Sequence, residues 1–295
     1  IALDDTRMWA FLLEADIAAL TRWCQASFDI PSGGEIRVLP MTSAVMMTVV
    51  DIGHGSFTDV PDMGWSKERE LTFWIPAVQV EEREGKSFAT RFDMVLPYLV
   101  LDNPVAIASG REIFGYRKQQ GKLTVPSDAD SGGGIAVDLF ATKTFGAGTQ
   151  EQFQRLLTLA PTGATKDFAG TSNFAAGVKA LWDYLAREAG WNPTLGFELD
   201  LLGNLLNCRV PQLFLKQFRD VADTRVACYQ AITEVMAEVT RFDALPGLVE
   251  YEMKLEALAS SPIAKDLGIA PMQKVLGLEL AFDLAIQPGE VLWEL

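Results

Sequence analysis

The sequence has 295 residues, of which 49% are hydrophobic, and it carries a formal net charge of −14. A chain of this length forms one large domain or two small ones. The strong negative charge argues against nucleic acid and against an anionic membrane surface as partners. A mean hydropathy of +0.14 is high for a soluble monomer, and it favours a homo-oligomer.

The three cysteines include no C-x-x-C pair, and there is one histidine, so neither a disulfide framework nor a zinc site is indicated. A reducing, cytoplasmic location is therefore expected. The first residues are too acidic for a signal peptide. No apolar run approaches the roughly 20 residues that cross a bilayer. No motif indicates a nucleotide or metal, and we expect no cofactor.

The first part of the chain has the pattern of a β-structure. A short helix is expected over residues 16–24, where Ile17, Leu20 and Trp23 share one face. Strands are expected over residues 35–51, 70–80, 88–100 and 105–118, followed by a turn-rich segment at 127–134. The intervening turns are too short for crossover helices, which predicts antiparallel pairing.

The middle of the chain changes character. Helical spacing over residues 149–159 and 173–188 predicts a largely helical insertion at about 146–206. Strand patterns return over residues 212–218, 227–242 and 276–286, and residues 251–260 are compatible with a helix. The expected fold is a single α+β domain over residues 1–295, dominated by β-structure and decorated by peripheral helices.

Lys118 is the residue best suited to covalent chemistry. It ends the apolar run of residues 105–118, and a lysine in apolar surroundings can lose its proton near neutral pH and attack a ketone. Alternation along a strand would direct Tyr116, Lys118 and Gln120 to one face and Arg117 with Gln119 to the other. The alternative from spacing alone is a lysine that ends a strand and projects into water.

The segment LDNPVAIASGREIFGYRKQ resembles the active-site segment of the acetoacetate decarboxylase family, which carries a LDN-x-x-AIA-x-GRE run followed by Y-P-K-K. The matching residues are Leu101, Asp102, Asn103, Ala106, Ile107, Ala108, Gly110, Arg111, Glu112, Tyr116 and Lys118. The resemblance implies an antiparallel β-barrel or cone in a homo-oligomer. It also implies a lysine that forms a Schiff base and needs no cofactor.

Further matches extend the resemblance. Glu70 lies six residues before Pro76, as the family's active-site glutamate precedes its IPV proline, and Glu68 is an alternative one strand register away. The segment PQLFLKQF from Pro211 resembles the family's PNYMLK strand, and the last strands are also similar. Most of the chain is covered, apart from residues 146–206.

Two departures bear on the expected chemistry. Gln119 replaces the family's second lysine, and Arg117 replaces the proline before the nucleophile. If Gln119 points away from the pocket, desolvation remains the larger influence on the pKa of Lys118, and the lysine can still act as nucleophile. The departures leave the substrate open.

Three more residues are candidates for substrate binding. Arg7 lies near the position of a family arginine, and a guanidinium fork suits a substrate carboxylate. Tyr116 can donate a hydrogen bond in the pocket or simply pack in the core. Arg111 and Glu112 are interpreted first as a buried structural pair, with Arg111 alternatively adding positive potential to the pocket.

The resemblance implies a lyase that decarboxylates a β-keto acid, such as acetoacetate, through an imine on Lys118 with Glu70 as the catalytic carboxylate. A second hypothesis keeps the imine but uses it for aldol condensation and dehydration, or for cyclisation, of a 2-oxo acid. A third is a β-barrel without catalysis that binds an apolar ligand. In the first two, the partner is a small keto acid.

Overall fold

The computed structural model describes residues 1–127, 133–166, 192, 195–196 and 203–295. The strands are β1 (Ala2–Glu14), β2 (Val38–Pro40), β3 (Ala44–Ser56), β4 (Trp65–Arg83), β5 (Lys86–Leu101), β6 (Lys118–Thr124), β7 (Ile135–Ala141), β8 (Gln152–Lys166), β9 (Leu195–Gly196), β10 (Arg209–Arg219), β11 (Ala227–Leu255), β12 (Met272–Ile286) and β13 (Glu290–Glu294). The helices are α1 (Ile17–Cys24), α2 (Pro104–Ile113), α4 (Gly203–Leu206) and α5 (Ile263–Leu267), with a π-turn at Gln25–Asp29 and a 3-10 turn at Pro61–Met63.

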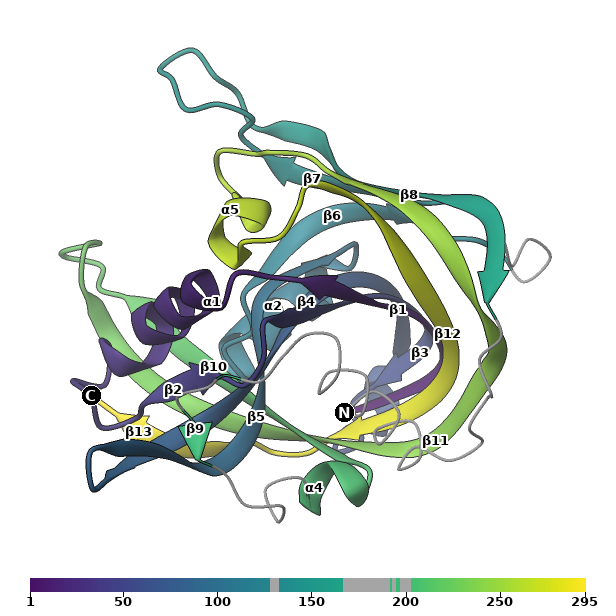
Figure 1. The fold of residues 1–295 in the computed structure, drawn as a ribbon. Coiled ribbons are helices and arrows are strands. Elements are labelled where there is room, and N and C mark those ends of the chain that lie inside the picture. The colour runs from purple at the N-terminus through teal and green to yellow at the C-terminus, as the bar shows by residue number, and fades with distance from the viewer. Residues whose placement is uncertain (128–132, 167–191, 193–194, 197–202) are drawn as a thin grey trace.

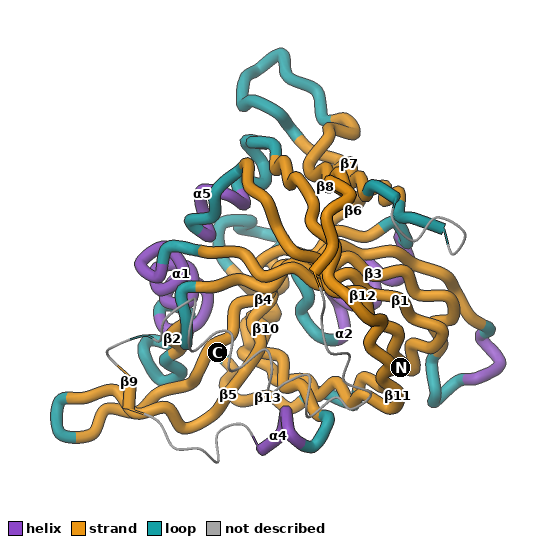
Figure 2. The backbone as a smooth tube through the Cα atoms, turned by 45° about the vertical axis from the view of Figure 1, so that its right-hand side comes forward, coloured by secondary structure: helices purple, strands orange, loops and turns teal. Residues whose placement is uncertain are grey.

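The described strands form one sheet that closes on itself. The order β10-β5-β6-β7-β8-β11-β12-β1-β3-β4-β2 is joined by the additional pairs β4–β5 and β10–β11. The β4–β5 pair closes a ring that runs in the order β5-β6-β7-β8-β11-β12-β1-β3-β4. The β10–β11 pair closes a second ring, in which β10 takes the place of β6, β7 and β8 between β5 and β11. In Figure 1 strands β8, β11, β12 and β1 curve around a common centre, and Figure 2 shows how strands dominate the chain. This confirms the expected β-dominated barrel with peripheral helices.

The pairing is antiparallel in most places but not everywhere. Strand β6 runs parallel to β5, with Leu99 opposite Lys118, and β10 runs parallel to β5, with Gln212 opposite Met94. A parallel connection needs a long crossover, and α2 occupies that crossover between β5 and β6. The expectation of purely antiparallel pairing is therefore wrong at β5, next to the predicted nucleophile.

Strands β3 and β4 have two distinct faces. Alternate residues of these strands are buried in the main apolar core, namely Val45, Met47, Val49, Leu71, Phe73 and Ile75. The intervening positions, which include Thr48, Val50, Glu68 and Glu70, point to the opposite side of the sheet. The same two strands thus supply a packed core on one face and a polar cavity on the other.

Helices α1 and α5 lie side by side outside the ring (Figure 1). Asp16 caps α1, because its Oδ1 accepts hydrogen bonds from the backbone N–H groups of Ala18 and Ala19 at 2.7 and 2.9 Å. Gly268 ends α5 with φ at +64°, and a Cβ there would lie 2.4 Å from the Cβ of Asp16. A glycine is thus required both by the backbone angle and by the close approach of the two helix ends.

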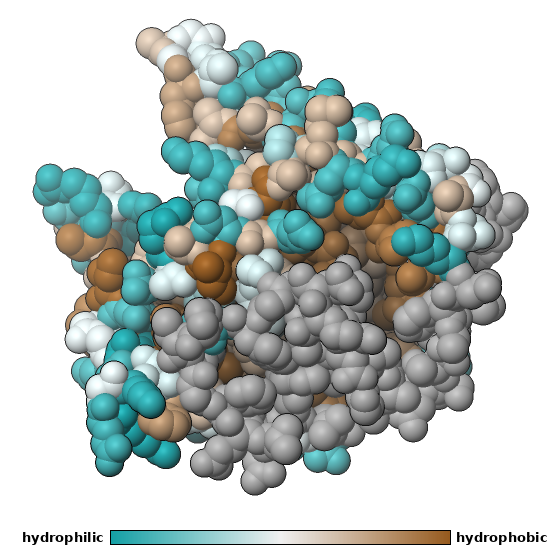
Figure 3. All heavy atoms as spheres, viewed as in Figure 1, coloured by the Kyte–Doolittle hydropathy of each residue, from teal (hydrophilic) through white to brown (hydrophobic). Residues whose placement is uncertain are grey.

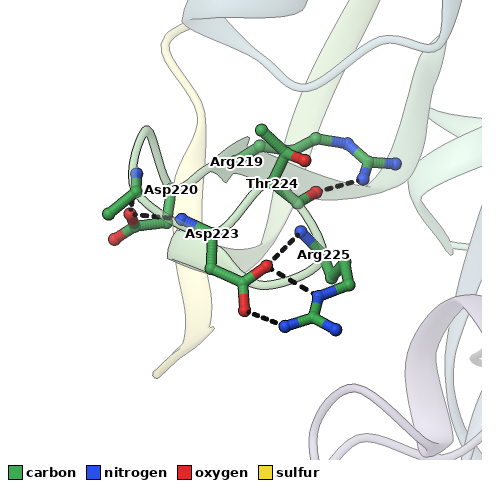
Figure 4. A network of polar contacts seen from close by, with 6 residues as sticks. Arg219, Asp220, Asp223, Thr224 and Arg225 are labelled. Atoms are coloured by element: carbon green, nitrogen blue, oxygen red, sulfur yellow. Dashed lines mark hydrogen bonds and ion pairs between the residues drawn. The ribbon is translucent and has the colours of Figure 1, made fainter.

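The hairpin tip between β10 and β11 is held by local polar contacts (Figure 4). The Asp223 carboxylate accepts from the backbone N–H of Arg225 and from two guanidinium nitrogens of the same residue, at 2.8 to 3.1 Å. Asp220 accepts from the backbone N–H of Ala222, and the Arg219 guanidinium donates to the carbonyl of Thr224. None of these residues lines the cavity described below.

Several predicted elements are confirmed. These are the helix over residues 16–24 and the strands over 35–51, 70–80, 88–100, 212–218, 227–242 and 276–286, although β2 and β3 divide the first strand range and most strands are longer than expected. No helix among the described residues has the length and apolar character needed to span a bilayer.

Three predicted elements are wrong. Residues 105–118 contain helix α2 and not a strand, so Lys118 begins a strand instead of ending one. Residues 149–159 belong largely to strand β8, which contradicts a helix there, and the first residues of 251–260 continue strand β11. The predicted helix over 173–188 lies outside the described residues, as does most of the predicted insertion.

Candidate active site

A cavity of about 130 Å³ lies on the face of β3 and β4 that is opposite to the main core. Its apolar lining includes Leu3, Met8, Val50, Leu96, Leu99, Phe282, Leu284 and Ile286. The ionisable side chains in its lining are those of Lys118, Glu68, Glu70 and Tyr116, and Lys118 has the only cationic side chain among the described lining residues. Figure 3, taken from one side, shows hydrophobic side chains in a hollow of the surface, with mostly hydrophilic ones above it.

The LDN sequence anchors helix α2 at this cavity. Asn103 caps the helix, because its Oδ1 accepts from the N–H groups of Val105 and Ala106 at 2.9 and 3.2 Å, and Pro104 occupies the first turn. Asp102 Oδ1 accepts from the backbone N–H of Arg69 at 2.8 Å, between the two glutamates of β4. These bonds fix the helix start against the strand that carries Glu68 and Glu70.

Lys118 lies half-buried against α2 with its amine in the cavity. Its Nζ donates to the carbonyl oxygen of Ala106 at 3.1 Å and lies 5.1 Å from the ring centroid of Tyr116. A Cβ at Gly110 would lie 2.7 Å from Cε and 2.8 Å from Nζ of the lysine. The glycine of the GRE sequence therefore leaves the space that the lysine side chain occupies. The alternative of a lysine projecting into bulk water does not fit this placement.

Glu68 and Glu70 both line the cavity, because they are two residues apart on one face of β4. Arg69, between them, turns to the other side and pairs with Asp51 at 3.0 Å. Glu68 is buried, and its Oε2 has no hydrogen-bond partner among the described residues. The sequence left these two glutamates as alternatives for one role, whereas the structure brings both to the lysine's cavity.

Burial controls the ionisation of both carboxyl groups. Burial raises the pKa of Glu70 to about 7; the negative charge of Glu68 adds to this rise, and Lys118 opposes it. Burial likewise raises the pKa of Glu68, where Lys118 opposes the rise and Asp102 adds to it. Near neutral pH the cavity can therefore hold a protonated and an ionised carboxyl at once, an arrangement suited to general acid–base catalysis.

Tyr116 contributes its ring to the cavity and its hydroxyl to a structural bond. The hydroxyl donates to Gln212 Oε1 at 2.7 Å, and both residues are buried. The ring packs edge-on against Phe114 and at 4.2 Å between centroids from Phe214. Burial, with the charges of the two glutamates, raises the pKa of Tyr116 far above its ordinary value. The phenol is thus a neutral, fixed wall of the site.

The departures from the family sequence face away from the cavity. Gln119 Nε2 donates to Ser261 Oγ at 3.0 Å, and the exposed Arg117 lies 5.7 Å from the ring of Trp23. The predicted alternation between Lys118 and Gln119 is therefore present. A lysine in place of Gln119 would not face the amine directly.

Two arginines from the sequence prediction are not brought to the lysine. Arg7 forms an ion pair with Glu279 and lies 4.6 Å from the ring of Trp9, whereas its neighbour Met8 lines the cavity. Alternation along β1 thus places Arg7 on the opposite face from the cavity. Arg111 and Glu112 are both exposed on α2, so the expected buried pair is wrong.

The sequence reasoning missed Thr48, Trp74 and Gln212. Trp74 Nε1 donates to Thr48 Oγ1 at 2.9 Å, and all three residues line the cavity. Gln212 follows Pro211 in the segment that resembles the family strand, so that resemblance was an available signal. Thr48 carried no such signal, because it is one polar residue in an apolar strand. No group of three or more metal-binding side chains occurs among the residues that the structure describes.

No protein-family model and no curated protein sequence matches the chain. Solved structures, in contrast, match over nearly its whole length. Acetoacetate decarboxylase from Legionella pneumophila has a TM-score of 0.54 at 16% identity, over 99% of this chain and 87% of its own. The enduracididine biosynthesis enzyme MppR, complexed with the condensation product of pyruvate and imidazole 4-carboxaldehyde, has a TM-score of 0.54 at 13% identity, over 98% and 88%.

An acetoacetate decarboxylase-like enzyme from Sphingomonas wittichii is similar to the same extent. It has a TM-score of 0.55 at 13% identity and covers 100% of this chain and 93% of its own. At these identities the likeness establishes the fold, while the chemistry has to be argued from the residues in the cavity.

Proposed function

We propose that this chain, which has the fold of the acetoacetate decarboxylase-like enzymes, is an enzyme that binds a ketone substrate covalently as an imine on Lys118. The observation that carries the proposal is the Lys118 amine in a cavity that also holds Glu68 and Glu70. A lysine amine without its proton is a nucleophile towards carbonyl carbon. The sequence resemblance around the same lysine supports this role.

The first step is attack of the neutral Lys118 amine on the substrate ketone, followed by uptake of one proton and loss of water to give a protonated imine; hydrolysis of the imine later returns that proton. This cation accepts an electron pair from the neighbouring carbon, either when a carboxylate leaves as carbon dioxide or when a base removes a proton. The product of both routes is an enamine. Reprotonation at carbon and hydrolysis by water release the ketone and restore the amine.

The geometry best supports the route in which a base removes a proton and the enamine then adds to a second carbonyl. Decarboxylation returns one proton to carbon, whereas aldol-type condensation moves protons at a carbon and at an oxygen. Two carboxyl groups, Glu68 and Glu70, share the cavity with the lysine, which fits a reaction with two proton transfers. MppR, which has the same fold, binds a condensation product of pyruvate and an aldehyde.

Decarboxylation of a β-keto acid such as acetoacetate is the second candidate. The LDN and GRE residues around Lys118 favour it, because they resemble the family in which that reaction occurs. The two reactions share the imine and Glu70 as the carboxylate beside it, and they differ in whether carbon dioxide is released.

Borohydride reduction tests the shared step. Incubation with pyruvate or acetoacetate and borohydride is expected to add one reduced adduct to Lys118, as located by peptide mass spectrometry. Lys118→Ala should abolish the adduct. Lys122→Ala is the matched control, because Lys122 is exposed on the same strand and should leave the adduct unchanged. Absence of an adduct with both ketones would support a non-catalytic barrel instead.

The two reactions are then separated by product. Carbon dioxide release from acetoacetate, compared with condensation of pyruvate with an aromatic aldehyde, reports which route the enzyme follows in the absence of borohydride. We expect condensation to exceed decarboxylation.

A further inference from the structure

The cavity orders its three ionisable groups along the strands. Thr72 of β4, Leu99 of β5 and Lys118 of β6 form one row across the sheet. Glu70 lies two residues away from Thr72 along β4, opposite Leu101, and Glu68 is two residues further along the same strand. At about 3.3 Å per residue, this places the backbone of Glu68 roughly 7 Å beyond that of Glu70. Glu70 is therefore the carboxyl closer in register to the lysine, and Glu68 is the distal one.

The surroundings of Glu68 leave its carboxyl available to a ligand. The neighbours of Glu68 and Glu70 on β3 are Ile52 and Val50, so that strand supplies no counter-charge, and the positive charge that acts on Glu68 is that of Lys118. Glu68 is 7% exposed, and its Oε2 has no hydrogen-bond donor or acceptor among the residues described. Such an unpaired buried polar atom costs about 1–3 kcal/mol of stability. A cavity-facing group held at that cost is suited to bind or protonate a substrate atom.

We infer that Glu68 is a second catalytic carboxyl, which protonates the carbonyl oxygen of an aldehyde while the enamine on Lys118 attacks the aldehyde carbon. This inference rests on the proposed function and assigns its second reactant to a class, an aldehyde. Glu70, nearer in register, acts at the carbon next to the imine.

The step begins from the form of the carboxyl pair in which Glu68 holds the proton and Glu70 is ionised, and from that form its proton and electron balance is complete. Glu70 takes the proton from the carbon next to the imine, and the electron pair of that C–H bond forms the enamine double bond. The enamine carbon then bonds to the aldehyde carbon. The π pair of the aldehyde moves to its oxygen, which takes the proton of Glu68. Transfer of one proton from Glu70 to Glu68 restores both groups, and water hydrolyses the imine.

The test separates the two carboxyls by three measurements on the full chain. Borohydride trapping of pyruvate reports imine formation, and exchange of the pyruvate methyl protons in heavy water, followed by proton NMR, reports enamine formation. Condensation of pyruvate with an aromatic aldehyde, followed by absorbance, reports the complete reaction. Glu68→Gln and Glu70→Gln keep the side-chain shape but can neither deliver nor accept a proton, and Glu112→Gln on the exposed side of α2 is the control.

Glu68→Gln is expected to leave trapping and exchange within about twofold of wild type and to slow condensation by about 100-fold or more. Glu70→Gln should slow exchange and condensation together. Glu68→Asp should restore part of the condensation rate. Glu68→Gln removes a buried ionisable group, so we expect it to fold, which its melting temperature will report.

Three results would overturn the inference while leaving the imine in place. These are condensation by Glu68→Gln within twofold of wild type, an equal loss of exchange and condensation in that variant, or wild-type enzyme that is trapped by pyruvate but does not condense it. Failure of wild-type enzyme to be trapped by any ketone would instead overturn the proposed function itself.

Discussion

Replacing Gly110 by alanine should displace the Lys118 side chain, and so slow its reaction, without destabilising the fold. The added Cβ would lie 2.7 Å from Cε, 2.8 Å from Nζ and 2.9 Å from Cδ of Lys118. Ordinary carbon contacts are about 3.5–4.0 Å, so the end of the lysine has to move by roughly 1 Å. A displacement of that size in an active site lowers the rate by about 100-fold.

Stability should change in the opposite direction. Gly110 lies inside α2, and its backbone is not in the left-handed region. Alanine in a helix interior is favoured over glycine by about 1 kcal/mol. The clash involves only the end of a flexible side chain, so we expect Gly110→Ala to unfold at the same or a slightly higher temperature than wild type.

The assay compares the initial rate of borohydride trapping by pyruvate with the melting temperature of the same sample. Glu112→Ala, on the exposed side of the same helix, is the control and should change neither quantity appreciably. A trapping rate for Gly110→Ala within about twofold of wild type would show that the space at this glycine does not position the nucleophile, and the reasoning would be refuted.

Three further predictions concern other contacts. Burial, with the carboxylate of Glu234 beside it, raises the pKa of Asp93 to about 8, so the stability that its protonated form contributes is lost as the pH rises from about 4 through 8. In wild type this lowers the unfolding free energy by up to about 1.4 kcal/mol per pH unit in that window, and in Asp93→Asn this pH dependence should be absent. Urea denaturation of both proteins at pH 5 and pH 8.5 measures the difference. An equal pH dependence in both proteins would contradict the assignment. Tyr116→Phe should lower the unfolding free energy by about 1–3 kcal/mol, because it leaves buried Gln212 without its donor; urea curves that superimpose on wild type would rule this out. Gln119→Lys should leave the rate of imine trapping within about twofold, since that side chain faces away from the cavity, and a tenfold gain would show that it does not.

The strands of the barrel were predictable because their periodicity is simple. The missed helix α2 shows a conflict between two local signals. Its β-branched residues favour a strand, but Asn103 and Pro104 supply a helix cap and a first-turn proline, and the capped helix is what forms. Lys118 lines a cavity, as one of the two interpretations of the sequence expected, but the element that precedes it is a helix and not the predicted strand.

Strand β8 was mistaken for a helix because its apolar spacing is not strictly alternating. Leu156 and Leu157 are adjacent and both fully buried, which neither a regular strand nor a surface helix explains. A register shift between β7 and β8 occurs at Val137 and Asp138, and such an irregularity turns consecutive residues to the same side. The position of a bulge depends on the partner strand, which local periodicity does not reveal.

The second glutamate was visible in the sequence but not its role. Glu68 and Glu70 are two residues apart, so a strand puts them on one face, yet the charged run around them also fits an exposed strand end. Only the tertiary structure, in which both glutamates line one cavity together with residues of α2, decides between the two. Arg7 shows the reverse case, because a match in sequence position placed it near the lysine and strand alternation places it on the other side.

The two-sided character of β4 has a consequence for how such a barrel diversifies. The residues of β4 that pack in the main core alternate along the strand with the residues that line the cavity. A substitution on one face therefore leaves the contacts of the other face in place. New chemistry can therefore arise at alternate positions of one strand while the scaffold keeps its shape. Proteins that share this architecture can accordingly differ in the reaction they catalyse although their folds superimpose.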